Sequence, residues 1–383
     1  MKHISFLLIT VLFLSCGKKI PDNITEIHIQ VENVKEELDI SPLFEDSVDI
    51  IPLETVSECL ISEIQKIECR NRLIYASDEA GQTVYVFDEK GKYVRSIGRK
   101  GNGPGEYSEL GDFIFAGDSI LIKDKFQDRI LVYDSTGNFL SYIALKDIPS
   151  VEFTGVDNRI YFIINHEKSE LGHYNVIAFD LKTQDYHTYL PYDKNTPLPW
   201  GLSNYIGSYK NRTLFIQARD SHIYRIINGT VVPEYVVTFS KDCIPPHYLK
   251  NMNGEEVLTE AMKNGYITGI NSIVNSRDRL FLSYSAGMRT EVLYDINRHE
   301  TSICYRFIIK DMGELYVNRF QTADNDSFFI IQDAEIFITA WEKIYRNRYF
   351  KNENIKNKMN ELYSKIREDD NPVIFKLKFK NVN

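Results

Sequence analysis

Two stretches of this sequence share one order of features, and they decide the fold. They are "NRLIYASDEAGQTVYVFDEKGKYVRSIG", residues 71–98, and "DSILIKDKFQDRILVYDSTGNFLSYIAL", residues 118–145. In each, a short apolar strand ends at an Asp, a polar turn follows, and a second strand ends in an aromatic residue and another Asp. A turn containing Gly, which accepts a positive φ without steric cost, then leads to a third strand. This order predicts antiparallel β-sheets joined by short hairpins.

Weaker copies of the same unit follow along the chain. They begin at Asn158, Asn211, Asp278 and Asn325. The copies recur roughly every 40 to 65 residues, and a repeat of this length indicates one small sheet per unit. A lone sheet of four strands cannot bury both of its faces, whereas six such sheets packed around an axis can. The sequence therefore predicts an all-β fold over residues 26–383: a six-bladed β-propeller with four-stranded antiparallel blades.

The two ends of the chain and two insertions complete this prediction. We expect an N-terminal strand at residues 48–53 to close the last blade beside a C-terminal strand at residues 373–379, which hides a sheet edge. Helical spacing of apolar residues predicts short helical insertions at residues 245–263 and 352–368. If the strands of each blade run A to D from axis to rim, the D–A and B–C connections lie at the same end. Both insertions are expected at that end.

The N-terminus predicts export. The apolar run 4–14 spans only about 16 Å as a helix, which is too short for a hydrocarbon core of roughly 30 Å. Residues 1–15 are therefore expected to be a signal peptide. The sequence Leu14-Ser15-Cys16 resembles a bacterial lipobox, so Cys16 is expected to carry lipid and residues 16–25 to form an anchor linker.

The repeats also resemble a known family. The order Asp, turn, strand, aromatic residue, Asp and Gly turn is similar to NHL repeats, and residues 97–107 resemble the glycine stretch that joins NHL blades. With the lipobox and "DDNPVIFKLKF" at 369–379, the whole chain resembles the six-bladed β-propeller lipoproteins of the Bacteroidetes. The resemblance implies a fold and a place in the cell envelope but no established reaction. Because residues 17–19 lack the acidic side chains of a surface-export signal, we expect outer-membrane attachment on the periplasmic side.

Composition and motifs argue against several function classes. The net charge of −9 disfavours nucleic acid as a partner. The eight His residues form no metal-binding motif and no G-x-S-x-G occurs, so we predict no metal, no cofactor and no catalytic residue. After Cys16 the spacing of the cysteines is irregular, which predicts free thiols or at most one disulfide among Cys59, Cys69, Cys243 and Cys304.

The glycine-rich segment 98–106 is expected to be a rigid D–A junction. It lacks the Lys-Ser/Thr and the following helix of a phosphate-binding loop, and Pro104 removes a backbone donor. Asp residues recur after the B strands, which favours hydrogen bonding between blades over chemistry. Side chains near the mouth of the ring, including a Trp able to stack on a sugar, remain candidates for ligand binding. They are Arg99, Lys100, Asn102, Trp200, Arg219, Asp220, His222 and Arg289.

Three functions fit these patterns. The first is a non-catalytic binding propeller, held on the membrane by its lipid, whose loop face holds a glycan, a peptide or an envelope protein. The second is a hydrolase or lyase acting on a glycan or lactone at the axis, and the third is a structural subunit of an envelope complex. The lack of metal and nucleophile motifs favours the first.

Overall fold

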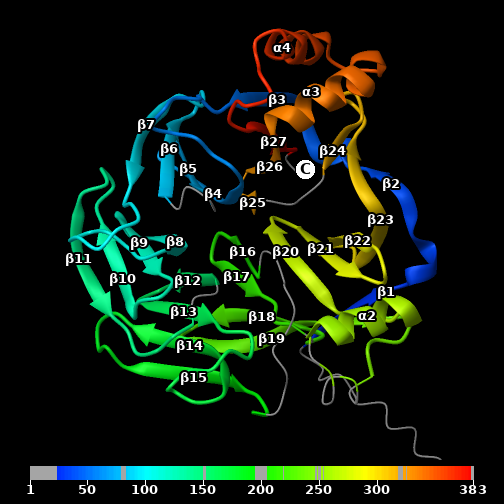
Figure 1. Ribbon diagram of the computed structural model, residues 1–383. Helices are drawn as coiled ribbons and strands as arrows, with labels where there is room; N and C mark the ends of the chain where they lie inside the picture. The colour runs from blue at the N-terminus through cyan, green and yellow to red at the C-terminus, as the bar shows by residue number, and fades with distance from the viewer. Residues whose placement is uncertain are drawn as a thin grey trace, which may run out of the picture.

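Six small sheets surround a central axis and confirm the predicted six-bladed propeller (Figure 1). The computed structural model describes residues 24–78, 83–149, 152–194, 205–218, 220–245, 248, 252, 254–317, 322–324 and 326–380. Cys16, Trp200 and Arg219 lie outside these residues, as do the expected signal peptide and most of the linker.

Blades 1 to 3 each have four antiparallel strands in chain order from the axis to the rim. Blade 1 contains β4 (Ile64–Arg70), β5 (Leu73–Asp78), β6 (Thr83–Asp88) and β7 (Tyr93–Ile97). Blade 2 contains β8 (Leu110–Ala116), β9 (Ser119–Asp124), β10 (Arg129–Tyr133) and β11 (Phe139–Ala144). Blade 3 contains β12 (Glu152–Val156), β13 (Arg159–Ile163), β14 (Tyr174–Asp180) and β15 (Tyr186–Pro191).

Blades 4 to 6 repeat this order and also receive the N-terminal segment. Blade 4 contains β16 (Ile206–Tyr209), β17 (Arg212–Phe215), β18 (His222–Ile227) and β19 (Thr230–Phe239). Blade 5 contains β20 (Ile270–Ser276), β21 (Arg279–Ser285), β22 (Arg289–Asp295) and β23 (Glu300–Ile309), with β24 (Leu315–Val317) paired to β23. Blade 6 contains β25 (Thr322–Ala323), β26 (Ser327–Gln332), β27 (Val373–Phe379) and the N-terminal β3 (Phe44–Pro52).

The expected ring closure is confirmed, because β3 pairs antiparallel with β27 as the outer strand of blade 6. Two further strands were not foreseen. β1 (Thr25–Ile29) adds in parallel to the outer strand of blade 4, and β2 (Lys35–Asp39) adds in parallel to that of blade 5. The N-terminal segment 25–52 thus forms a strap along the rims of three successive blades.

The helical insertions are present with altered bounds. α2 (Gly254–Asn264) lies in the D–A connection between blades 4 and 5, as expected. The insertion between β26 and β27 holds two α-helices instead of one, α3 (Ala334–Lys343) and α4 (Glu353–Tyr363). The sixth copy of the repeat, which begins at Asn325, was expected to continue as strand, but α3 takes up its later part. The apolar side chains Phe337 and Trp341 of this helix are buried in the core shared by blades 5 and 6. Among the described residues, no helix is both long and apolar enough to cross a membrane.

Hydrophobic clusters lie between neighbouring blades rather than within them. On β9, Ile120 and Ile122 pack toward blade 1 while Leu121 packs toward blade 3, as the period of two in a strand requires. Each blade therefore depends on both neighbours for burial of its faces, which ties the stability of the ring to its closure.

Candidate functional site

The described candidate residues do not form one cluster, since they belong to different blades and several have a local partner. Arg99 Nε donates to Glu106 Oε1 at 2.6 Å within the glycine-rich segment. Arg289 Nε donates to Glu291 Oε1 at 2.6 Å within blade 5. Lys100 and Asn102 are exposed. These partners indicate local structural roles.

Glu106 organises the glycine-rich junction. Its Oε2 accepts the backbone N–H of Gly103 at 2.7 Å, and that hydrogen bond with the one from Arg99 lowers the pKa of Glu106. A side chain at Gly98 would meet the rings of Tyr107 and Tyr133, and its φ of +66° already favours glycine. The segment thus packs as a corner between blades 1 and 2.

Asp220 and His222 do come together, inside blade 4. The backbone N–H of His222 donates to Asp220 Oδ1 at 2.9 Å, and the ring Nδ1 lies 2.7 Å from the same oxygen. Burial alone would raise the pKa of Asp220. The hydrogen bonds from Tyr224 and His222 outweigh this effect, so the net result is a lowered pKa. The carboxylate therefore stays ionised and fully engaged by its neighbours.

The recurring Asp residues act within blades, which corrects the expectation of bonds between blades. Asp78 accepts the backbone N–H groups of Ser62 and Glu63, just before the inner strand of the same blade. Asp124 accepts the N–H of Ser108 in the equivalent place in blade 2. The Asp thus fixes the D–A connection against its own B strand.

Sequence reasoning missed a concave site at the axis, a cavity of about 610 Å³. The inner strands of all six blades line it, and none of the described candidate residues is in its lining. Its ionisable side chains come mainly from blades 1 to 3; they are Lys66, Glu68, Asp112, Lys125, Glu152 and Lys210. A charged residue in an otherwise apolar inner strand, as Asp112 is in β8, was the available signal.

Three of these residues link successive blades around the axis, and we call Lys66, Asp112 and Glu152 the inner clasp. Lys66 Nζ donates to Asp112 Oδ1 at 3.0 Å and to the carbonyl of Phe113 at 2.8 Å. Asp112 Oδ2 accepts the N–H of Phe153 at 3.2 Å, and Glu152 Oε2 accepts that of Ile206 at 3.0 Å. Each side chain thus bonds the inner strand of the next blade.

Burial and neighbouring charges shift the pKa values of the ionisable groups in and beside the clasp. Burial and the nearby Asp112 carboxylate raise the pKa of Glu152 to about 7. Burial also raises the pKa of Glu68. For Lys66, burial acts to lower the pKa, but Asp112 and Glu68 outweigh it and raise the pKa. The cavity therefore holds a fixed cation, and Glu152 can exchange a proton near neutral pH.

The described residues contain no group of three or more His, Cys, Asp or Glu arranged to hold a metal ion. The four cysteines of the described chain are free, and burial raises the pKa of Cys59, Cys69 and Cys304 to about 12, so these thiols are poor nucleophiles. The carboxylates mostly serve contacts between blades.

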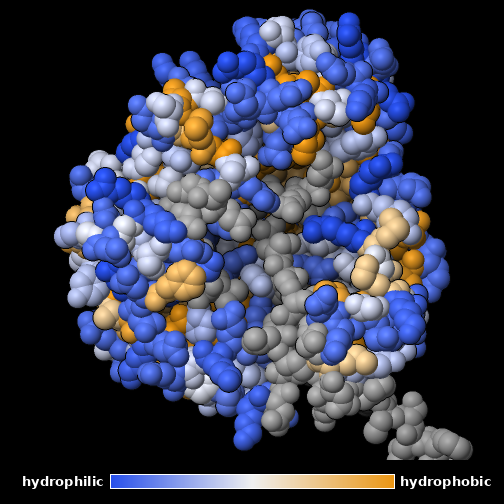
Figure 2. All heavy atoms as spheres, in the orientation of Figure 1, coloured by the Kyte–Doolittle hydropathy of each residue, from blue (hydrophilic) through white to orange (hydrophobic). Residues whose placement is uncertain are grey.

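One end of the ring carries more exposed apolar side chains than the other. Of the ten exposed large hydrophobic residues in the described part of the chain, six lie on D–A or B–C connections: Leu60, Phe126, Met262, Met288, Ile336 and Tyr349. The other four lie on outer strands. Phe126 and Met288 are 71% and 60% exposed, on B–C turns of blades 2 and 5. On the face that Figure 2 shows, apolar side chains stand among a larger number of hydrophilic ones.

The sequence matches a known family, and the fold is similar to known structures. The family described as "Domain of unknown function (DUF4934)" matches residues 24–378. No curated protein shows significant sequence similarity. The crystal structure of a "Putative exported protein" from Bacteroides fragilis NCTC 9343 is similar with a TM-score of 0.76 and 22% identity, covering 93% of this chain and 100% of that one. A member of the DUF4221 family from Bacteroides vulgatus ATCC 8482 has a TM-score of 0.49 and 12% identity, covering 89% and 98%.

Proposed function

This chain belongs to the DUF4934 family, and we propose that it is a non-catalytic binding protein of the bacterial cell envelope that holds a protein partner on the D–A/B–C end of its ring. The exposed Phe126, Met262 and Met288 on that end carry the proposal. Aromatic and Met side chains are enriched in protein interfaces, and all three of these side chains lie on connections at one end of the ring.

Placement in the envelope rests on the N-terminus. The apolar run that ends in Leu14-Ser15-Cys16 supports export followed by lipid attachment at Cys16. The similar Bacteroides fragilis protein is described as exported, which is consistent with this placement. In the proposal, the lipid holds the protein on the outer membrane, facing the periplasm.

Site-specific photo-crosslinking tests the binding end. A photoreactive residue is placed at 126, 262 or 288, and, as matched controls, at the exposed positions Lys92, Ser135 and Lys182 on C–D turns of the opposite end. In intact cells of the native host, we expect one discrete adduct from the first set and none from the controls. Equal labelling from both ends would contradict the proposal.

A second candidate function is favoured by one observation at the axis. Glu152 and Glu68 both have raised pKa values inside the axial cavity, which suits acid–base chemistry on a bound glycan or lactone. A compound that the wild type converts and the Glu152→Gln variant binds but does not convert would select this alternative.

A further inference from the structure

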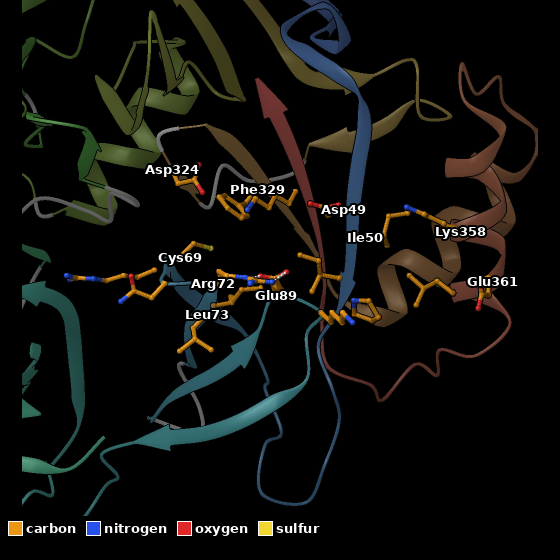
Figure 3. Close-up of a pocket in the computed structure, with 18 of the residues that line it drawn as sticks. Asp49, Ile50, Cys69, Arg72, Leu73, Glu89, Asp324, Phe329, Lys358 and Glu361 are labelled. Carbon is orange, nitrogen blue, oxygen red and sulfur yellow. Dashed lines mark hydrogen bonds and ion pairs between the residues drawn. The ribbon is translucent and has the colours of Figure 1, made fainter. Parts of the chain in front are cut away.

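A second cavity lies at the junction where the ring closes, between blade 6 and blade 1 (Figure 3). Its volume is about 770 Å³, within the usual range for organic ligands. The walls come from β3 and β27 of blade 6, from the β4–β5 and β6–β7 turns of blade 1, and from α4. Those turns are A–B and C–D connections, whereas α4 belongs to the B–C insertion of blade 6, so the cavity is bounded by elements from both ends of the ring.

The charge of this cavity differs from that of the whole chain. The chain has a net charge of −9, yet the lining holds more basic than acidic side chains. The basic ones are Arg70, Arg72, Lys90, Lys358, Lys365 and Lys376; the acidic ones are Asp49, Glu89, Asp324 and Glu361. Such an excess attracts anions, most strongly at low ionic strength.

Local pairing leaves three of these cations without an acidic partner. Arg72 donates two hydrogen bonds to the carboxylate of Glu89. Lys365 forms an ion pair with Glu361 at 2.5 Å, and Arg70 forms one with Asp118 of blade 2 at 3.7 Å. Within the described residues, no carboxylate lies within ion-pair distance of three lysines that come from three different walls. They are Lys90, Lys358 and Lys376.

The lysines and Arg72 converge on the cavity. The hydrogen bond from Arg72 lowers the pKa of Glu89, and the nearby charges of Lys376 and Lys90 lower it further. The ammonium group of Lys376 stands over the ring of Phe329, 5.6 Å from its centroid. Lys358 extends from α4 toward β3 (Figure 3). One Glu carboxylate therefore faces several cations at once, and the Arg72 fork shows that a carboxylate suits the site.

The two remaining acids reduce this excess but do not remove it. Asp324 Oδ1 accepts the backbone N–H groups of Asp326 and Ser327, so it is engaged by its own turn. Asp49 lies opposite Lys376 in the β3–β27 register without forming an ion pair with it. Between the charges, Ile50, Leu73 and Leu362 are partly buried and present apolar surface.

We propose that this cavity binds an acidic oligosaccharide. Its carboxylate groups lie against Lys90, Lys358 and Lys376, and its sugar rings cover the aliphatic side chains of Ile50, Leu73 and Leu362. The three lysines stand on three walls of the cavity, and a chain of acidic sugars carries several charges at the spacing of its rings, whereas an inorganic anion carries its charge at one point.

Isothermal titration of the mature chain with tetragalacturonate tests this proposal. We expect the wild type to bind the tetrasaccharide, with affinity that falls as salt is raised, and to show no binding of neutral maltotetraose. The variant Lys90→Gln/Lys358→Gln changes two exposed side chains and should lower the affinity roughly tenfold or more. The control Lys92→Gln/Lys343→Gln removes the same charge outside the lining and should bind as the wild type does.

Several outcomes would overturn the proposal. They are no binding of tetragalacturonate, an equal loss in the control variant, and equal affinity for maltotetraose. Tight binding of tetraglutamate or citrate without the tetrasaccharide would likewise show that the site takes a different class of anion. Equal thermal melting of both variants and the wild type excludes unfolding as the cause of a loss.

Discussion

Side chains stabilise this protein over two ranges, within single turns and between blades. Within a turn, Asp134 Oδ1 accepts the N–H groups of Thr136 and Asn138, and Gly137 takes a φ of +92°. Between blades, Lys66 and Asp112 of the inner clasp are 46 positions apart and meet only through the packing of two blades.

Protonation of Glu152 should be visible in the stability of the protein. Its pKa is about 7 in the folded protein against 4.5 for an ordinary glutamate. The stability that the protonated side chain contributes is therefore fully present below pH 4.5 and is lost as the pH rises through 7. Glu152→Gln stays neutral and keeps an oxygen that accepts the N–H of Ile206. At pH 8.5 the variant should therefore exceed the wild type in free energy of unfolding by about 1–3 kcal/mol.

The pH dependence is the critical readout for this prediction. Urea unfolding at pH 5 and pH 8.5 should show the advantage of the variant shrinking or reversing at the lower pH, where Glu152 is already protonated. An advantage of the same size at both pH values would show that the proton on Glu152 is not its cause.

Secondary-structure elements were predicted where the pattern is strong and missed where distant packing decides. The strands of blades 1 and 2 follow from alternation and turn chemistry. α3, with the sequence AEIFITAWEK, is rich in β-branched and aromatic residues, and burial of Phe337 and Trp341 makes it a helix. β1 and β2 have only five residues each, and their partners are about 210 and 270 positions away.

The strap of residues 25–52 should contribute measurably to the stability of the ring. Ile27 on β1 is fully buried between blades 4 and 5, so Ile27→Ala should lower the free energy of unfolding by about 2–4 kcal/mol. Val232→Ala, on the neighbouring β19, is the control. Because Val232 is 36% exposed, this change should lower the free energy of unfolding only slightly. Urea denaturation of both variants measures the difference, and equal stabilities would mean that β1 does not support the ring.

At the scale of the whole molecule, closure by β3 and β27 could be proposed from the sequence, since an expected strand lies near each end of the chain. The position of the functional site could be predicted less well from the sequence. The sequence pointed to Arg99, Asp220, His222 and Arg289, which the fold distributes over separate blades with local partners. The exposed apolar side chains of the D–A/B–C end emerged only when loops from blades 2, 4 and 5 came to one end of the ring.

Binding of a protein partner at this end is tested most directly by Phe126→Asp/Met288→Asp, compared with Leu140→Asp/Tyr142→Asp. Both variants remove two exposed apolar side chains and add two charges, but the control changes the outer strand β11. The measurement is the amount of partner recovered with each tagged protein from crosslinked native envelopes. We predict loss of the partner from the first variant and full recovery with the control; recovery unchanged in the first variant, or lost equally in both, would contradict binding at this end.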